Sequence, residues 1–230
     1  MFLRQRSTQA EYFDAERPRH ELEEFYRALR RVNRLFWLPR PFQRALPGLL
    51  GESACRSVSF LDLGAGDGWL AGTLTRWAGD RGWNWRGVNL DLSHQALSLN
   101  QAGVNVAGSV LALPFQAESF DLVIASQMTH HLSDEGAEQH LREAWRVARR
   151  VCFISDLHRN AALYGLLWMA FRLTRLPRHC CQDGLLSVRR GWRLAELRKL
   201  AGRAGIPQPK VKLYFGARVL VYGVKEEPMR

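Results

Sequence analysis

A glycine-rich turn directly after an apolar strand is the feature that most restricts the fold of this chain. Val58–Leu63 reads as a short strand, Gly64, Gly66 and Gly68 follow it, and apolar residues then recur at helical spacing from Leu70. Glycine allows a tight turn and lets a ligand approach the backbone closely. The helix that follows offers unpaired N–H groups at its start. The segment therefore predicts a strand, a ligand-facing turn and a helix.

Alternating strand and helix patterns continue beyond this turn. Strands are expected at residues 83–90, 104–106, 120–125 and 151–154, and helices at residues 93–100 and 141–148. Such alternation predicts βαβ units with a parallel sheet and right-handed crossovers. After a further helix at residues 192–204, strands at 210–214 and 218–223 flank a short turn, which predicts an antiparallel hairpin.

We expect one domain with four parts. Residues 1–50 form an N-terminal tail and helical cap, residues 55–156 a ligand-binding core, residues 157–190 an inserted lid, and residues 191–230 the last helix and hairpin. Residues 1–19 lack periodicity and are expected to be a loose tail. An apolar helical face, i, i+4, i+7 and i+11, follows in the cap. Its members are Phe25, Leu29, Val32 and Phe36.

The formal net charge of +11 attracts nucleic acid, anionic lipid or acidic ligands without choosing among them. The N-terminus does not resemble a signal peptide. The apolar run 161–173 is shorter than the roughly 20 residues that span a bilayer, although it could touch a membrane surface. We therefore expect a cytoplasmic protein with reduced cysteines and no metal site, and the sequence leaves the oligomeric state open.

The spacing of the glycines distinguishes two classes of ligand. Dinucleotide folds use G-x-G-x-x-G, but here the third glycine position holds the bulky Trp69. Asp62, just before the turn, repels phosphate and favours a cationic amino group. Asp91 stands at the carboxyl end of the second strand, where an acid accepts hydrogen bonds from ribose hydroxyls. The alternative role for Asp91 is that of a helix N-cap or loop acid.

With these motifs in order, the chain resembles the class I S-adenosylmethionine-dependent methyltransferases. Residues 62–68 match the D-x-G-x-G-x-G form of that family's first motif, and residues 108–115 and 119–127 match its third and fourth motifs. The resemblance implies a Rossmann-like α/β fold with a seven-stranded, mostly parallel sheet, helices on both faces and an antiparallel C-terminal hairpin strand. It also implies S-adenosylmethionine as cofactor. The implied cofactor-binding residues are Asp62, Gly64, Ala65, Gly66, Gly68, Asp91, Leu92, Ser109, Val110, Ser126 and Gln127.

The N-terminal helix and residues 155–160 resemble those of small bacterial methyltransferases of polyketide, quinone and lipid-phenol pathways. A phenol or enol acceptor benefits from a base that removes its proton, and histidine suits this role at neutral pH. His130 and His131 follow the fourth strand, and His131 is our first choice. His158 is a further candidate, Asp156 could orient a histidine, and His94 and His140 are expected on helix surfaces.

The inserted segment 157–190 is expected to form an apolar lid over the site, although it could also be plain core. The function expected is O-methylation of a hydrophobic phenolic, polyketide or quinone-type molecule, as in secondary metabolism, with C-methylation as the near variant. Methylation of RNA or DNA is the main alternative because of the charge. Against it, residues 126–129 lack the Asn/Asp-Pro-Pro-aromatic signature, and no cysteine follows a proline. A non-catalytic partner protein with this fold is the third alternative.

Overall fold

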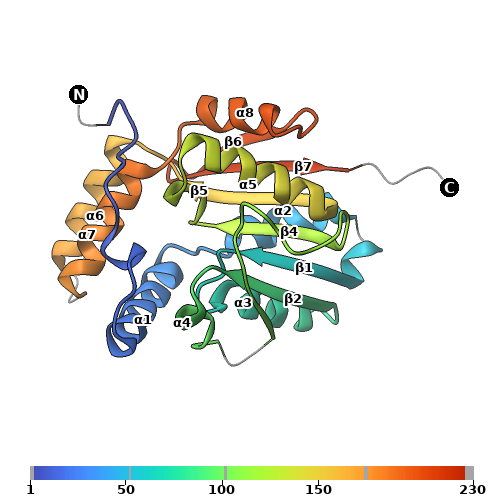
Figure 1. Cartoon of the computed structure of the whole chain (residues 1–230), viewed down its shortest axis with the longest axis horizontal. Helices are drawn as coiled ribbons and strands as arrows, with labels where there is room; N and C mark the ends of the chain where they lie inside the picture. The colour runs from blue at the N-terminus through green and yellow to red at the C-terminus, as the bar shows by residue number, and fades with distance from the viewer. Residues whose placement is uncertain (1–2, 52, 101–102, 174–175, 226–230) are drawn as a thin grey trace.

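The computed structural model describes residues 3–51, 53–100, 103–173 and 176–225. Within them, seven strands form one sheet in the order β3-β2-β1-β4-β5-β7-β6 (Figure 1). The first five strands are mutually parallel, and β7 runs antiparallel to both β5 and β6. The predicted Rossmann-like architecture is confirmed. The strands are β1 (Ser57–Leu63), β2 (Asn84–Asp91), β3 (Val104–Ala107), β4 (Phe120–Ser126), β5 (Ala148–Leu157), β6 (Lys210–Tyr214) and β7 (Arg218–Val224).

Helices cover both faces of the sheet and one of its edges. The α-helices are α1 (Arg19–Leu35), α2 (Arg40–Leu50), α3 (Trp69–Gly79), α4 (His94–Leu97), α5 (Asp134–Val147), α6 (Ala161–Leu173), α7 (Arg178–Arg190) and α8 (Leu194–Arg203). Short 3₁₀ turns are η1 (Tyr12–Asp14), η2 (Ala54–Arg56) and η3 (Thr129–His131). The helix expected at 93–100 is shorter than predicted: α4 starts at the Ser93 cap and ends at Leu97. None of the described helices is long and apolar enough to cross a bilayer.

The core lies on the two faces of the sheet. Successive strand residues point to opposite faces, so Phe60 packs with α2 and α3 while Leu61 packs with α5 and α8. In the same way, Val123 packs on the face with α5 and α8, and Ile124 on the face with α2 and α3. A central strand buried on both faces is mostly apolar, which explains the run Leu122–Ala125 in β4.

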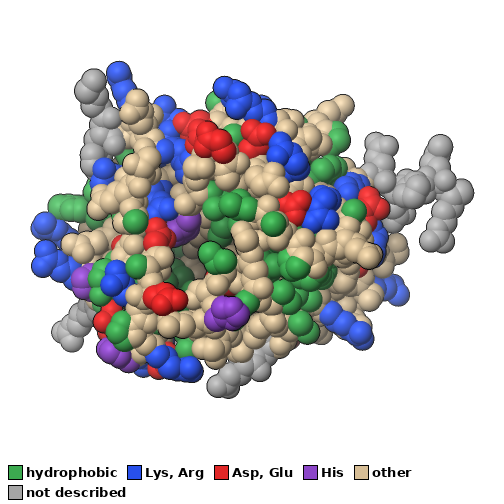
Figure 2. Space-filling model, in the orientation of Figure 1, with side chains coloured by type: hydrophobic (Ala, Val, Ile, Leu, Met, Phe, Trp, Pro, Cys, Tyr) green, Lys and Arg blue, Asp and Glu red, His purple; other side chains and the backbone are tan. Residues whose placement is uncertain are grey.

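The carboxyl ends of the parallel strands meet at one edge, the usual place for a ligand in this kind of sheet. Helices α1, α6 and α7 stand over this edge (Figure 1). Figure 2 shows the surface hollowed there, with hydrophobic and histidine side chains at the hollow. The insertion predicted at 157–190 supplies α6 and α7 of this cover.

The expectation of a loose N-terminal tail is wrong. Residues 3–18, which we call the N-terminal strap, run along α7 to the start of α1 (Figure 1). Ser7 donates its backbone N–H to the carbonyl of Arg189. The backbone N–H of Tyr12 donates to the Asp183 carboxylate at 2.9 Å. These partners lie far along the chain and leave no periodic pattern, so local sequence did not reveal them.

Candidate active site

The glycine turn is fixed by the end of the neighbouring strand. Gly64, Gly66 and Gly68 all have positive φ, between 56° and 70°, which glycine adopts readily. Gly64 and Ala65 both donate backbone N–H groups to the carbonyl of Leu90, at 2.8 and 3.0 Å. A side chain at Gly64 would collide with Met128. The turn is therefore locked between β2 and the segment that follows β4.

Asp91 connects the turn to the loop after β3. Its carboxylate accepts hydrogen bonds from the backbone N–H groups of Gly66 and Ser93, both at 2.8 Å. Its backbone carbonyl accepts from Gly108 at 3.0 Å, which brings the Ser109–Val110 pair beside it. Each carboxylate oxygen keeps a further lone pair for a ligand hydroxyl. Leu92, also expected at the site, is exposed next to Asp91.

Asp62 is a buried acid that lacks a cationic partner among the described residues. Its Oδ2 atom has no hydrogen-bond partner, and neither has the buried Oγ of Ser126 at the end of β4. Burial, with a further contribution from the charge of Asp91, raises the pKa of Asp62 to about 8. A buried, unpaired carboxyl group costs free energy. A cationic ligand group beside Asp62 would remove that cost.

We call Asp62, the turn 64–68, Asp91 and Ser126 the cradle. Helix α1 covers it, a contact that no sequence pattern predicted. A side chain at Gly66 would collide with the ring and hydroxyl of Tyr26. Arg30, one turn further along α1, donates from Nε to the buried carboxylate of Asp67 at 2.6 Å. Tyr26 and Arg30 lie outside the apolar pattern used to predict this helix, so that pattern did not mark them.

The second part of the site begins at Gln127, the residue that follows β4. Gln127 has a φ of 52°, in the left-handed region that non-glycine residues rarely adopt. Its backbone N–H donates to the carbonyl of Ser155 at 2.9 Å. Backbone strain of this kind is concentrated at functional sites. The turn η3, with His130 and His131, begins two residues later.

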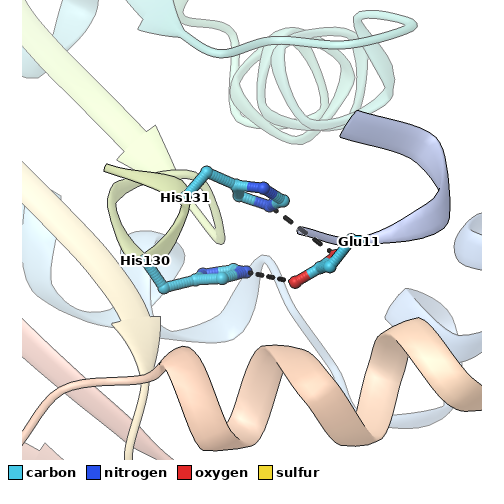
Figure 3. A group of neighbouring side chains, drawn as sticks. All are labelled: Glu11, His130 and His131. Atoms are coloured by element: carbon cyan, nitrogen blue, oxygen red, sulfur yellow. Dashed lines mark ion pairs between the residues drawn. The ribbon is translucent and has the colours of Figure 1, made fainter. Parts of the chain in front are cut away.

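His130 is buried between two acids. Its Nδ1 lies 2.6 Å from Oδ1 of Asp156, and its Nε2 lies 3.7 Å from Oε1 of Glu11 (Figure 3). Burial opposes a charge on the ring, but Asp156 and Glu11 outweigh it and raise the pKa of His130 to about 9. Only 2% of the side chain is exposed. His130 is therefore an internal cation, and Asp156 orients a histidine as predicted.

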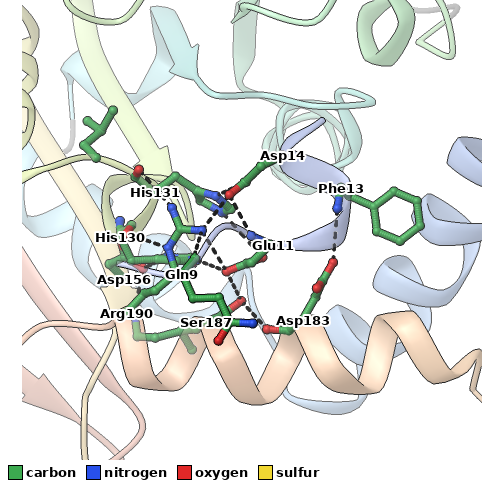
Figure 4. Close-up of polar contacts among 12 residues, drawn as sticks. Gln9, Glu11, Phe13, Asp14, His130, His131, Asp156, Asp183, Ser187 and Arg190 are labelled. Atoms are coloured by element: carbon green, nitrogen blue, oxygen red, sulfur yellow. Dashed lines mark hydrogen bonds and ion pairs between the residues drawn. The ribbon is translucent and has the colours of Figure 1, made fainter. Parts of the chain in front are cut away.

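His131 is the accessible member of the pair. Its side chain is 33% exposed, and its Nδ1 lies 2.7 Å from Oδ1 of Asp14 in the strap (Figure 4). Arg190 of α7 donates to the other oxygen of Asp14 at 2.6 Å and to the carbonyl of His131 at 2.9 Å. Although burial opposes ionisation of Asp14, His131 and Arg190 lower its pKa well below the usual range. Strap and α7 together hold this imidazole in place.

Glu11, His130 and His131 have donor types that could hold a metal ion. Their donor atoms lie within 4.8 Å of one another. Donors about 2.1 Å from a shared tetrahedral ion lie about 3.4 Å apart, so the group would have to contract around a metal. Its present spacing is that of an ion-pair cluster.

The other three histidines considered in the sequence lie elsewhere. His158 is not brought to this cluster, because its Nδ1 contacts the carbonyl of Gly216 at 3.2 Å in the β6–β7 turn. His140 is not on the helix surface as expected. It is fully buried in α5, and burial lowers its pKa to about 4. His94 is exposed, as predicted.

The cradle fits S-adenosylmethionine on three observations of this chain. Asp62 and Ser126 have buried polar atoms without partners. The positive-φ glycines keep side chains out of the turn. Asp91 keeps acceptor capacity beside Ser109 and Val110, whose neighbour Gly108 is bonded to it. The first observation suits a cationic ammonium group, the second a ligand that lies close to the backbone, and the third a pair of ribose hydroxyls.

Comparisons with known proteins agree with this geometry. The family model described as "Methyltransferase domain" matches residues 61–153. A demethylmenaquinone methyltransferase of Roseiflexus castenholzii is 34% identical over 116 residues, which are 49% of this chain and 46% of that protein. The match thus spans about half of this chain and less than half of that relative.

Solved structures share the fold at low sequence identity. A SAM-dependent methyltransferase from Thermotoga maritima has a TM-score of 0.58 at 18% identity, covering 89% of this chain and 99% of that one. The magnesium protoporphyrin IX methyltransferase of Synechocystis, with bound S-adenosylhomocysteine, has a TM-score of 0.54 at 15% identity, covering 82% and 83%. Residues 61–153 therefore match the methyltransferase-domain family, and the chain has a fold that S-adenosylmethionine-dependent methyltransferases share.

Proposed function

We propose that this chain transfers a methyl group from S-adenosylmethionine to the hydroxyl group of a hydrophobic phenolic, polyketide or quinone-type small molecule. The observation that carries the proposal is the partly exposed His131, held by Asp14 directly after the β4 end of the cradle. C-methylation of the same kind of ring is the near variant. The Roseiflexus relative, named for demethylmenaquinone, supports a quinone-type acceptor.

On this proposal the cradle holds the cofactor with the residues predicted for it. Asp62 faces the amino group, Asp91 the ribose, Ser109 and Val110 the adenine, and Ser126 and Gln127 the edge where the methyl group lies. When bound, the cofactor supplies an already activated sulfonium methyl. The protein's task is therefore to align the nucleophile and exclude water. Helix α1 serves the second purpose through Tyr26.

We assign the proton-accepting role to His131. Its Nδ1 is bonded to Asp14, so we assign proton transfer from an acceptor hydroxyl to Nε2, which lies 3.9 Å from Oε2 of Glu11. Asp14 stabilises the imidazolium that forms. His130 is a poor base because it is buried and already carries a proton at neutral pH, as its pKa of about 9 indicates. His130 instead positions η3 through Asp156 and Glu11.

The cover of the site favours an apolar acceptor. A small cluster, in which Leu157, Leu163, Leu167 and Val188 are buried, joins β5, α6 and α7, and Phe36, Tyr164 and Phe171 pack against it. Pockets for small molecules are mostly apolar with a few polar groups. We propose that apolar residues of this cover contact a hydrophobic ring system, with His131 as the polar group.

The basic charge gives little support to nucleic acid as the acceptor. Several arginines near the site are used in internal ion pairs: Arg6 with Asp134, Arg30 with Asp67, Arg159 with Glu196, and Arg190 with Asp14. Arginines paired in this way do not offer their full charge to phosphates.

A methyl-transfer screen with labelled cofactor tests the proposal. The panel contains phenols, quinones, fatty acids and RNA, and Asp91→Ala serves as the matched control with a damaged cradle. We expect label in a phenol or quinone with the wild type, and mass and NMR analysis of the product to separate O- from C-methylation. Label in RNA but in no small molecule would overturn the proposal.

A further inference from the structure

Helix α6 exposes an apolar stripe that nothing in the described chain covers. Leu163 and Leu167 are buried, whereas Leu166, Met169 and Leu173 on another side of the helix are between 52% and 88% exposed. With Ala162 they recur at i, i+4, i+7 and i+11, which is one continuous face. A helix that is apolar on all sides is normally surrounded by protein or by membrane.

Two further aromatic side chains are exposed on segments next to α6. Trp37 is in the α1–α2 corner and Phe215 is at the tip of the β6–β7 turn, where it is 78% exposed. Phe36, next to Trp37 in the chain, and Ala217, two residues after Phe215, both pack against the cluster that includes Leu163. Arg218 also donates to the carbonyl of Phe36 at 3.3 Å. The stripe, Trp37 and Phe215 together are called the α6 surface below.

Both aromatic residues have a strained backbone conformation. Trp37 and Phe215 have φ values of 48° and 45°, a region that bulky residues rarely adopt. Phe215 and Gly216 both have positive φ, as in a type I′ turn, where Asn or Gly is preferred at the first position. Both rings are nevertheless exposed, so no burial within the chain offsets this strain. The strain is explained if these rings are buried against something outside the chain.

Arginines lie over the exposed aromatic rings of the α6 surface and beside them. Arg40 stacks over Trp37 at 4.3 Å, Arg172 over Trp168 at 4.2 Å, and Arg44 lies 5.8 Å from the Phe215 ring. None of these arginines forms an ion pair with a carboxylate of the described residues. The sequence segments that build this surface, 25–51, 157–182 and 197–225, contain no Asp or Glu at all.

We propose that the α6 surface docks on an anionic lipid bilayer. Leucine, methionine and aromatic side chains enter the interface, while arginines that flank them remain at the headgroups. Phosphate groups of nucleic acid would neutralise the arginines but leave the apolar stripe in water. A second copy of the chain would bring two acid-free surfaces together, and these repel. An anionic bilayer can both pair with the arginines and bury the apolar stripe.

Vesicle co-sedimentation tests this inference without cofactor or acceptor, so its outcome is independent of the methyl-transfer screen. The probe is phosphatidylcholine vesicles containing phosphatidylglycerol, compared with pure phosphatidylcholine vesicles, at about 0.15 M salt. The variant is Leu166→Glu with Met169→Glu. The matched control is Val104→Glu, which places the same charge on an exposed apolar residue of β3, away from α6.

We expect wild type and Val104→Glu to bind the anionic vesicles, and the α6 variant to bind about tenfold or more weakly. Binding by the wild type should fall in the uncharged vesicles and at high salt. Unchanged thermal unfolding of the variant shows that it is folded. Wild type that stays in the supernatant, or an α6 variant that binds like Val104→Glu, would overturn the proposal. So would a dimer that the α6 variant disrupts without any change in vesicle binding, because the surface is then an interface between copies.

Discussion

Nδ1 of His130 lies 2.6 Å from Oδ1 of Asp156, and both side chains are almost completely shielded from solvent. Asp156 also accepts the backbone N–H of His130 at 2.8 Å, through its second oxygen. The last residues of β5 thereby fix the turn after β4. His131, the proposed base, follows on that same turn.

The first prediction concerns stability and pH. The pKa of His130 is raised in the folded protein to about 9, above its ordinary 6.5. A raised histidine pKa gives stability that is complete below pH 6.5 and is lost as pH rises through about 9. We expect the free energy of unfolding to fall by about 3 kcal/mol across this interval. Urea unfolding of His130→Gln should show a smaller fall than the wild type, because only the contribution of Asp62 remains, whereas the exposed control His94→Gln should retain the wild-type fall. Equal slopes in wild type and His130→Gln would contradict the account.

The second prediction concerns Asp62. Its pKa is raised to about 8 by burial, so the folded state holds a proton that the unfolded state releases above about pH 4. Stability therefore decreases as pH rises between these values. Asp62→Asn removes this cost and should raise the melting temperature of the ligand-free protein at pH 8, while weakening S-adenosylhomocysteine binding. An Asn variant that is less stable and binds equally well would show that Asp62 has no cationic ligand.

The third prediction concerns the contact between α1 and the turn. Gly66→Ala places a methyl group against Tyr26 and adds strain at a φ of 56°. We expect at least a tenfold loss of S-adenosylhomocysteine affinity and a loss of roughly 1–3 kcal/mol of stability. Gly79→Ala is the control, because Gly79 has negative φ and open space around it. Equal behaviour of the two variants in calorimetry would argue against a closed cradle.

The fourth prediction concerns the reaction. His131→Ala should lower kcat by roughly 10²–10⁴ with an acceptor found by the screen, and leave cofactor affinity nearly unchanged. His158→Ala should retain kcat, because His158 is bonded to the β6–β7 turn. Full turnover by His131→Ala would make this histidine structural and leave catalysis to positioning.

The sequence predicted those parts of the site whose function depends on local backbone. Gly64, Gly66 and Gly68 adopt positive φ because no other residue does so readily, and the strand before them is apolar because it is buried on both faces. Asp91 was found from its place at the end of a strand. Such signals are contained within a few neighbouring residues and can be read without knowing the fold.

The parts that the sequence did not predict depend on contacts between distant segments. Glu11 and Asp14 carry no pattern, and their role emerges only where the strap meets η3 and α7. His140 was expected at the surface, because a histidine in a helix with a charged side is usually exposed. It is buried in α5, where both ring nitrogens lack partners among the described residues. Burial of a polar residue is decided by packing between elements, which local sequence does not encode.

Binding of the cofactor in this cradle is the claim on which the account depends, and calorimetry with S-adenosylhomocysteine tests it most directly. Asp91→Ala removes the carboxylate that we propose binds the ribose, while leaving Asp62 and Asp67 in place. We predict saturable binding by the wild type and a loss of roughly 1.5–3 kcal/mol in Asp91→Ala, the range for hydrogen bonds to a charged group. Wild-type affinity no better than that of Asp91→Ala would contradict the assignment of this cradle.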